Sequence, residues 1–154
     1  MKLLGRVLAV IGAIFVLALA VFAFLASSAS AFKDEHQAFV REFATEFCRT
    51  WDPATVEASM SNQLLSELAT PDGVQTLALF RPLGALEDLT DMELANYISG
   101  TDGKTGVFRF KGAFENGRGV VTVSVNESDE AVRVIGFHIS ITGQGDGANR
   151  RHRA

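Results

Sequence analysis

The chain has 154 residues, 47% of them hydrophobic, which is enough for one domain with a real core once an N-terminal segment is set aside. Its formal charge is −4, but residues 32–142 alone hold nine basic and seventeen acidic residues, a net charge near −8. So acidic a domain repels phosphate backbones, which argues against nucleic acid as a partner. Cys48 is the only cysteine, so a disulfide within one chain is excluded. A buried thiol beside Phe47 is favoured over a bridge between two chains.

The N-terminal segment is an apolar run without charge over residues 7–26. As a helix, about 20 residues rise roughly 30 Å and cross a hydrocarbon core. A signal peptide cleaved after Ala31 and a membrane anchor both fit this pattern, and the length favours the anchor because signal centres run about 7–15 residues. Residues 26–31 would then be a short linker. In both interpretations Lys2 and Arg6 stay on the cytoplasmic side, so the domain lies outside it, either anchored to the membrane or secreted into the periplasm.

Three helices are predicted between residues 33 and 80. The first covers residues 33–51, where aromatic side chains recur every fourth residue and form one apolar stripe. Asp52-Pro53 and Thr70-Pro71 are each typical of an N-cap followed by proline at the first helical position. A second helix is therefore predicted to about residue 68 and a short third one to about residue 80. The residues predicted to be buried are Phe39, Phe43, Phe47, Trp51, Val56, Met60, Leu64, Leu68, Val74, Leu77 and Phe80.

A three-stranded antiparallel meander is predicted over residues 106–142, where β-branched and aromatic residues alternate with polar ones between Gly-, Asn- and Asp-containing turns. The alternation places Phe108, Phe110 and Phe114 on the core face and Arg109 on the other. Residues 86–98 hold no single period, so two short extended pieces are predicted there, over 85–88 and 93–99. Residues 100–106 are predicted to form a hairpin loop, and the Gly-rich basic tail, 143–154, is predicted to be disordered.

The last strand changes the parity of its apolar residues. Val132 and Val134 alternate with Arg133, whereas the apolar set further along begins at Ile135. A strand with one buried face cannot change parity without an extra residue. A bulge or sharp bend is therefore predicted near residues 134–136, and it would curl the sheet.

Residue types that carry chemistry are sparse. Only His36, His138 and His152 are present, and none has a second metal ligand at a useful spacing in the sequence. His36 is predicted to be solvated in the first turn of a helix, and His138 to be exposed on its strand. The carboxylates between residues 87 and 93 are typical of a solvated loop. No nucleophile–base arrangement or phosphate-binding glycine loop is present, so no catalytic residue, metal or cofactor is predicted.

Two polar residues are the most defensible pocket candidates. Tyr97 is the only tyrosine, and its hydroxyl needs a partner if it is buried. Arg109 would either reach an anionic ligand or point outward from its strand, and Trp51 would either line a pocket mouth or plug the core. The candidate pocket residues are therefore Tyr97, Trp51, Phe43, Phe47, Phe110 and Arg109.

The order of these elements resembles the NTF2-like (cystatin-like) superfamily, and within it the small bacterial extracytoplasmic members with an N-terminal signal or anchor. The resemblance covers residues 33–142 and rests on the aromatic first helix, the FRPLGAL passage at 80–86, and the VTVSV and RVIGFHI strands. It implies an α+β fold in which a curved antiparallel sheet wraps the long helix around a conical pocket. It also implies pairing of two copies through their sheets, and either a small apolar ligand or a closed cone.

The sequence therefore predicts three parts: an anchor or signal peptide over 1–31, an NTF2-like domain over 32–142, and the tail. The predicted function is a membrane-tethered extracytoplasmic binding or interaction module without enzymatic activity. The alternative is a SnoaL-like enzyme that uses Tyr97 and a carboxylate such as Asp88 inside the cone. A third interpretation, an accessory subunit of an envelope complex, would be marked by an exposed apolar sheet face.

Overall fold

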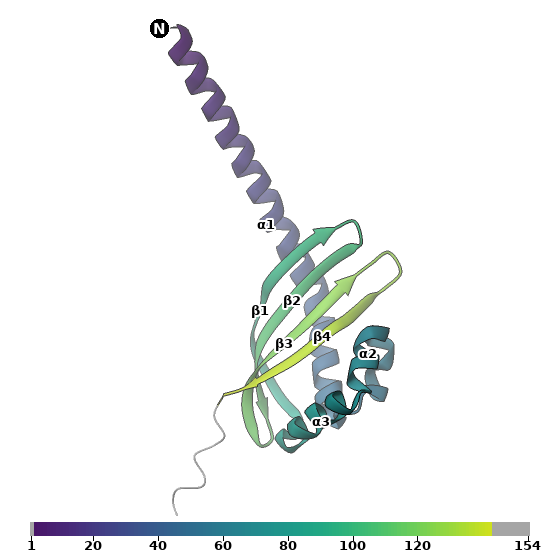
Figure 1. Ribbon diagram of the computed structural model, residues 1–154. Helices are drawn as coiled ribbons and strands as arrows, with labels where there is room; N and C mark the ends of the chain where they lie inside the picture. The colour runs from purple at the N-terminus through teal and green to yellow at the C-terminus, as the bar shows by residue number, and fades with distance from the viewer. Residues whose placement is uncertain (1, 143–154) are drawn as a thin grey trace, which may run out of the picture. The chain divides into compact units, whose positions relative to one another are not determined.

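The computed structural model describes the backbone of residues 2–142 and, within it, the side chains of residues 14–24 and 26–142. The fold is α+β, with helices that precede a four-stranded antiparallel sheet (Figure 1). The chain divides into two compact units, the first ending at Glu35 and the second beginning at His36. The predicted basic tail, with His152, lies outside the described residues.

The first unit consists of apolar helix. Helix α1 runs without interruption from Lys2 to Thr50, so the linker predicted at residues 26–31 is helical instead. In the described residues this is the one helix long and apolar enough to cross a membrane. The large apolar side chains between Ile14 and Phe24 are 52–73% exposed. This helix is compatible with a membrane anchor or a signal sequence, as predicted.

In the second unit, the C-terminal part of α1 confirms the predicted aromatic stripe. Phe43, Phe47 and Trp51 are 3% exposed or less, and Phe39 is half-buried. Cys48 is fully buried beside them, in agreement with the favoured interpretation of the thiol, and burial raises its pKa to about 12.

The segment predicted as one second helix is interrupted. It forms a 3₁₀ helix, η1 (Pro53–Ser59), and then a separate helix, α2 (Asn62–Leu68). Between them Met60 is extended and bridges to Val134, and the Ser61 amide donates a hydrogen bond to the Val134 carbonyl at 2.9 Å. The chain leaves the helical path here because its backbone pairs with the sheet. The Asp52 cap and the following proline are as predicted, and Asp52 Oδ1 accepts from the Ala54 amide.

Helix α3 (Pro71–Phe80) begins where Thr70 caps it, as predicted. Glycine has a low helix propensity, yet Gly73 lies in the first turn of α3. A Cβ atom at this position would collide with the backbone of Glu67 and Leu68, so glycine allows α3 to begin in close contact with the end of α2. Leu77 is buried as predicted, whereas Val74 is 56% exposed. The prediction for Val74 is wrong because, among the described residues of the second unit, no element covers this side chain, and the periodicity of the sequence cannot show this.

The passage between the helices and the sheet is a second 3₁₀ helix, η2 (Arg81–Leu83). It is held against the turn at residues 115–116, since the Asn116 backbone amide donates a hydrogen bond to the Leu83 carbonyl at 2.9 Å. The Ala85 amide donates to Glu115 Oε2, also at 2.9 Å. Gly84 adopts φ = 77°, a left-handed conformation that glycine reaches without strain.

The sheet consists of four strands that neighbour one another in sequence order, as Figure 1 shows. They are β1 (Leu86–Gly100), β2 (Gly103–Phe114), β3 (Gly117–Glu127) and β4 (Val132–Ile141). The last three confirm the predicted meander. β1 is one continuous strand in place of the two predicted pieces, and the hairpin loop predicted over 100–106 shrinks to the two residues between β1 and β2. Three register irregularities in β1, with Asp91 at φ = 54°, explain why its sequence holds no period.

The predicted bulge in β4 is confirmed. Ser124 pairs with Gly136 and Val125 with Val134, so Ile135 is the extra residue. Val134 is fully buried, Ile135 is 41% exposed, and Ile139 beyond the bulge is buried again. The strand thus keeps one apolar face toward the helices although its sequence changes parity.

Candidate functional site

The face of the sheet toward α1 is filled with aromatic rings. The ring centroid of Phe47 lies 5.0 Å from that of Phe137 on β4 and 5.7 Å from that of Phe43. Phe43 also meets Phe137 edge-on at 6.2 Å. These are contact distances for aromatic pairs, so a ligand cannot enter between these rings unless they separate. The predicted pocket residues Phe43 and Phe47 are therefore core residues.

Trp51 closes the other end of this ring cluster. Its indole lies 6.0 Å from the ring of Phe114 and 6.1 Å from that of Phe80, with interplanar angles of 30° in both pairs. Its Nε1–H donates to the Gly84 carbonyl at 3.0 Å, so the polar atom of this buried side chain is satisfied. Of the two interpretations of Trp51, the structure supports the plug, because the side chain is only 3% exposed.

Phe110 is 1% exposed and belongs to the same core face of the sheet. Arg109, its neighbour on β2, points away from that face, and its Nη1 lies 3.6 Å from Glu93 Oε1 with both side chains more than half exposed. An exposed ion pair of this kind adds little stability. The structure thus separates Arg109 from the aromatic cluster.

Tyr97 and Asp88 lie on opposite faces of the sheet. Tyr97 is half-buried and pairs with Gly106, which shares the parity of Phe108 and Phe110 on the core face. Asp88 pairs with Ala113, which shares the parity of Arg109. Residues directly opposite on antiparallel strands share a face, so these two candidates do not converge.

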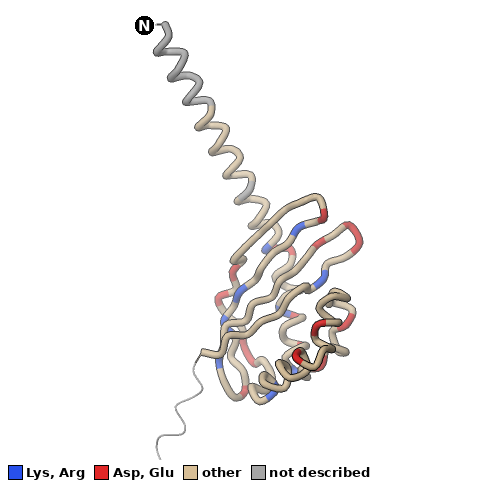
Figure 2. Tube along the Cα trace, viewed as in Figure 1, with Lys and Arg blue, Asp and Glu red and all other residues tan. Residues whose placement is uncertain are grey.

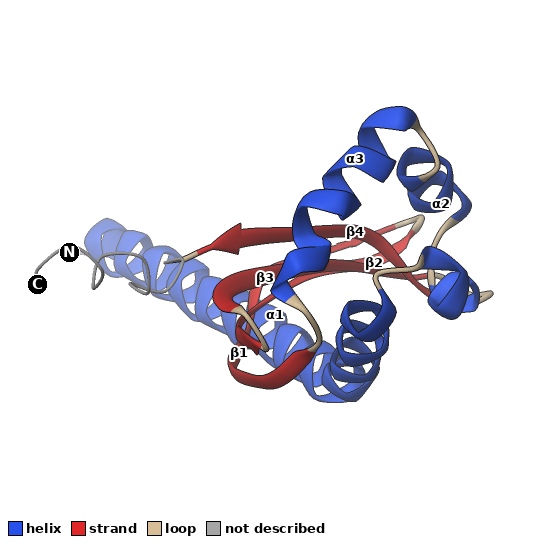
Figure 3. Ribbon diagram, turned by 90° about the horizontal axis from the view of Figure 1, so that it is seen from below, coloured by secondary structure: helices blue, strands red, loops and turns tan. Residues whose placement is uncertain are grey.

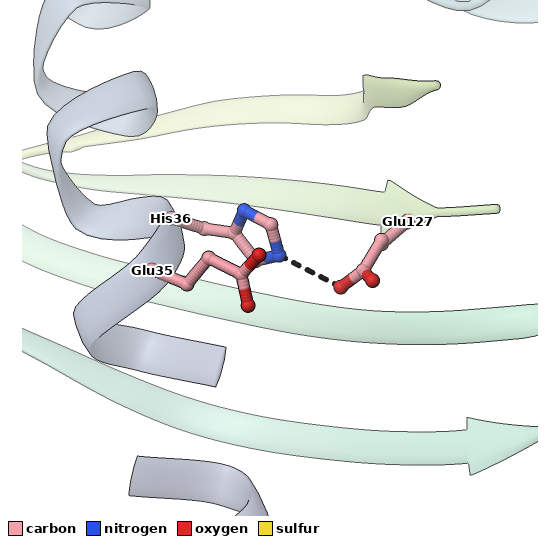
Figure 4. A group of neighbouring side chains, drawn as sticks. All are labelled: Glu35, His36 and Glu127. Atoms are coloured by element: carbon pink, nitrogen blue, oxygen red, sulfur yellow. Dashed lines mark hydrogen bonds and ion pairs between the residues drawn. The ribbon is translucent and has the colours of Figure 1, made fainter. Parts of the chain in front are cut away.

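His36 overturns a prediction. It was expected to be solvated, yet it is 5% exposed, and its Nε2 lies 2.8 Å from Glu127 Oε2 at the end of β3 (Figure 4). The sequence did indicate that His36 would be buried, because His36, Val40, Phe43 and Phe47 are spaced as one face of a helix. Its partner, 91 residues away, could not be foreseen.

The second Glu127 oxygen lies 3.3 Å from Lys104 Nζ on β2. The three side chains thus join α1, β2 and β3 at the end of the second unit where the chain enters it.

Within this unit His36 and Glu127 offer two metal-ligand atoms, whereas a catalytic zinc site uses three protein ligands. Figure 4 also labels Glu35, which is exposed and is the last residue of the first unit. The charged lysine beside Glu127 suits an ion pair better than a bound cation.

This hydrogen bond predicts how stability depends on pH. The bond from His36, assisted by Lys104 and opposed by burial, holds the pKa of Glu127 below its ordinary value of 4.5. A lowered folded-state pKa stabilises the fold above the unfolded-state pKa, and this contribution is lost as the pH falls through the folded value.

Glu127→Gln is therefore expected to cost about 1 kcal/mol at pH 7. The gap to the wild-type chain should close as the pH is lowered below 4.5. Urea unfolding followed by Trp51 fluorescence between pH 3 and pH 7 measures this gap. Glu130→Gln, on the exposed β3–β4 turn, should change nothing, and a gap that stays constant with pH would contradict the assignment.

The remaining candidate is an apolar groove on the surface of the second unit, formed by η1, α2 and α3. It has a volume of about 360 Å³. Its floor and walls include Pro53, Leu65, Leu68, Val74 and Leu77, and its edges include Asp52, Glu57 and Arg81. Figure 3 shows these helices grouped beside β4. The groove was not predicted, because one second helix was expected where η1 and α2 are separate elements that form the groove together with α3.

The outer face of the sheet is polar. Across the strands, Glu93, Arg109, Thr122 and His138 form one row, and Thr90, Lys111, Val120 and Ser140 form the next. His138 is exposed, as predicted, and its Nε2 lies 3.3 Å from Ser140 Oγ. Ile98, which pairs with Thr105 on this face, is an exception at 60% exposed, so the interpretation as a subunit of an envelope complex stays a prediction.

Comparison of the chain with protein-family models, with curated proteins and with solved structures gives no match.

Proposed function

We propose that the chain is a membrane-tethered interaction module whose domain lies on the extracytoplasmic side and acts without enzymatic chemistry. The observation that carries the proposal is the run of large apolar side chains between Ile14 and Phe24, each more than half exposed. Such a surface is stable in lipid and not in water. Lys2 and Arg6 before it favour a cytoplasmic N-terminus, which leaves the domain outside.

We infer that the domain is NTF2-like. This is supported by helices that precede a curled antiparallel sheet, by a bulge in β4 that bends the sheet, and by the aromatic stripe of α1 against the core face. The resemblance also implies pairing of two copies through their sheets, whose outer face is mostly polar with Ile98 exposed on it.

The absence of an enzymatic role is supported by the interior of the domain. The rings of Phe43, Phe47 and Phe137 occupy the space that a substrate would need. The rival SnoaL-like enzyme needs a tyrosine and a carboxylate on one side of the sheet, whereas Tyr97 and Asp88 lie on opposite faces. A module of this kind would bind its partner on its surface.

Fractionation tests the tether. The full-length chain is expected in the membrane pellet after carbonate and high-salt washes and should be extracted only by detergent. Its intact mass should include residues 1–31, as the anchor interpretation requires. A soluble chain whose mass shows that it begins at residue 32 would support the signal-peptide interpretation in place of the anchor. A chain that keeps residues 1–31 and is still soluble would contradict the proposal.

A further inference from the structure

The surface groove between η1, α2 and α3 exposes apolar side chains that the fold leaves uncovered. Leu77 at its base is 5% exposed, whereas Val74 on its wall is 56% exposed. An exposed valine beside half-buried Leu65 and Leu68 makes a continuous apolar strip, a common feature of surfaces that bind another protein. The same helix exposes Leu79 even more, at 69%, but Leu79 does not line the groove.

The charge around the groove has one dominant sign. Residues 52–81, the segment from which the groove is built, contain four acidic residues and one basic residue (Figure 2). They are Asp52, Glu57, Glu67, Asp72 and Arg81. Of these five, Asp52, Glu57 and Arg81 line the groove, so two carboxylates and one guanidinium lie at its edge. An apolar floor with an acidic edge is complementary to a segment that is apolar on one side and basic on the other.

The groove also has a defined position within the second unit. The chain enters this unit at His36, and the groove begins at Asp52, just beyond the end of α1 at Thr50. The fourteen helical residues in between rise roughly 21 Å. The groove thus lies at the opposite end of this helical segment from the residue that connects the unit to the apolar helix.

We propose that this groove binds an amphipathic helix of a partner protein, with apolar residues that enter the groove and Lys or Arg residues that meet its acidic edge. This rests on the proposed function of the chain as an interaction module and names the surface and the chemistry of the partner. An amphipathic helix laid in an apolar groove is a common mode of peptide recognition. Asp52 and Glu57 would set its orientation, because the basic side of the helix must face them.

The test uses the full-length chain in nanodiscs of zwitterionic lipid and a fluorescently labelled helical peptide of leucine and lysine with one apolar side. A matched peptide has glutamate in place of each lysine, and empty nanodiscs give the background. The lysine peptide is expected to bind at least about tenfold more tightly than the glutamate peptide, and increasing salt should reduce this difference.

Three variants locate the binding surface. Val74→Ser should weaken binding of the lysine peptide about fivefold by removing apolar contact. Glu57→Lys should weaken it by a similar factor, about fivefold, through repulsion. Leu79→Ser removes a still more exposed apolar side chain of the same helix, one that does not line the groove, and should leave binding unchanged. Trp51 fluorescence confirms that each variant is folded, since this tryptophan is buried in the core.

A photo-crosslinking residue gives a second readout that does not depend on a loss of affinity. Placed at position 74 it should label the lysine peptide, and placed at position 79 it should not. Equal binding of the two peptides, equal labelling from both positions, or no effect of Val74→Ser would each overturn the proposal. The tether is assessed separately in the same preparation, by whether the chain enters the nanodiscs, so failure of the groove and failure of the proposed function are distinguishable.

Discussion

Phe47→Ala is expected to lower the free energy of unfolding by about 3–5 kcal/mol, the range measured for phenylalanines truncated in a packed core. Phe47 is fully buried and contacts three aromatic rings, those of Phe43, Trp51 and Phe137. Its loss removes apolar burial and leaves a cavity at the centre of the cluster. Denaturant unfolding of the chain in mild detergent, followed by Trp51 fluorescence, measures the change.

Phe39→Ala is the matched control. It makes the same chemical change in the same helix, but Phe39 is more exposed than Phe47, so its loss should cost clearly less. If Phe47→Ala cost no more than Phe39→Ala, the aromatic stripe would not be packed against the sheet. The filled interior, and with it the case against an internal substrate site, would then be wrong.

The second large effect concerns the bulge in β4. Val134→Asp is expected to destabilise the fold by at least about 3–5 kcal/mol, because it places a charge without a partner in the core. Ile135→Asp, one residue further, should cost only about 1 kcal/mol, since Ile135 is the extra residue and is 41% exposed. Thermal unfolding of the two variants side by side gives the comparison.

Beyond the bulge the parity is reversed, which supplies a second pair of variants. Ile139→Asp should be as damaging as Val134→Asp, and His138→Asp should be tolerated, because Ile139 is buried and His138 is exposed. A strand without the bulge would place Val134 and His138 on one face. Tolerance of Ile139→Asp together with damage from His138→Asp would therefore contradict the observed register.

The sequence predicted well those features that depend on neighbouring residues. The meander, its core parity at Phe108 and Phe110, and the bulge all follow from a period of two and its interruption near Val134. The caps at Asp52 and Thr70 follow from local hydrogen-bonding chemistry.

Features that depend on distant partners were missed. The break at Met60 arises because its backbone pairs with Val134, which no helical periodicity contains. The sequence predicts two short pieces in place of β1, because bulges in this strand disturb the alternation of apolar and polar residues. The pairing of β1 with β2 nevertheless continues through the bulges. The burial of His36 depends on a strand end 91 residues away.

The candidate site shows the same difference between features set by neighbouring residues and features set by distant partners. Phe43, Phe47, Trp51 and Phe110 were correctly grouped as apolar, but an apolar stripe looks alike whether it lines a pocket or fills a core. Only the ring distances decide between the two. The groove was not predicted, because its walls come from three short elements whose mutual packing depends on Gly73 and on the break at Met60.

The packing of α1 into the bent sheet is tested most directly by nuclear Overhauser contacts between the ring protons of Phe47 and Phe137 in the isotope-labelled full-length chain. The ring centroids are 5.0 Å apart, so strong cross-peaks between assigned ring protons are expected. Assigned rings that give no cross-peak, with Phe137 in contact with water or with a bound molecule instead, would contradict the filled interior from which the surface-binding role is inferred.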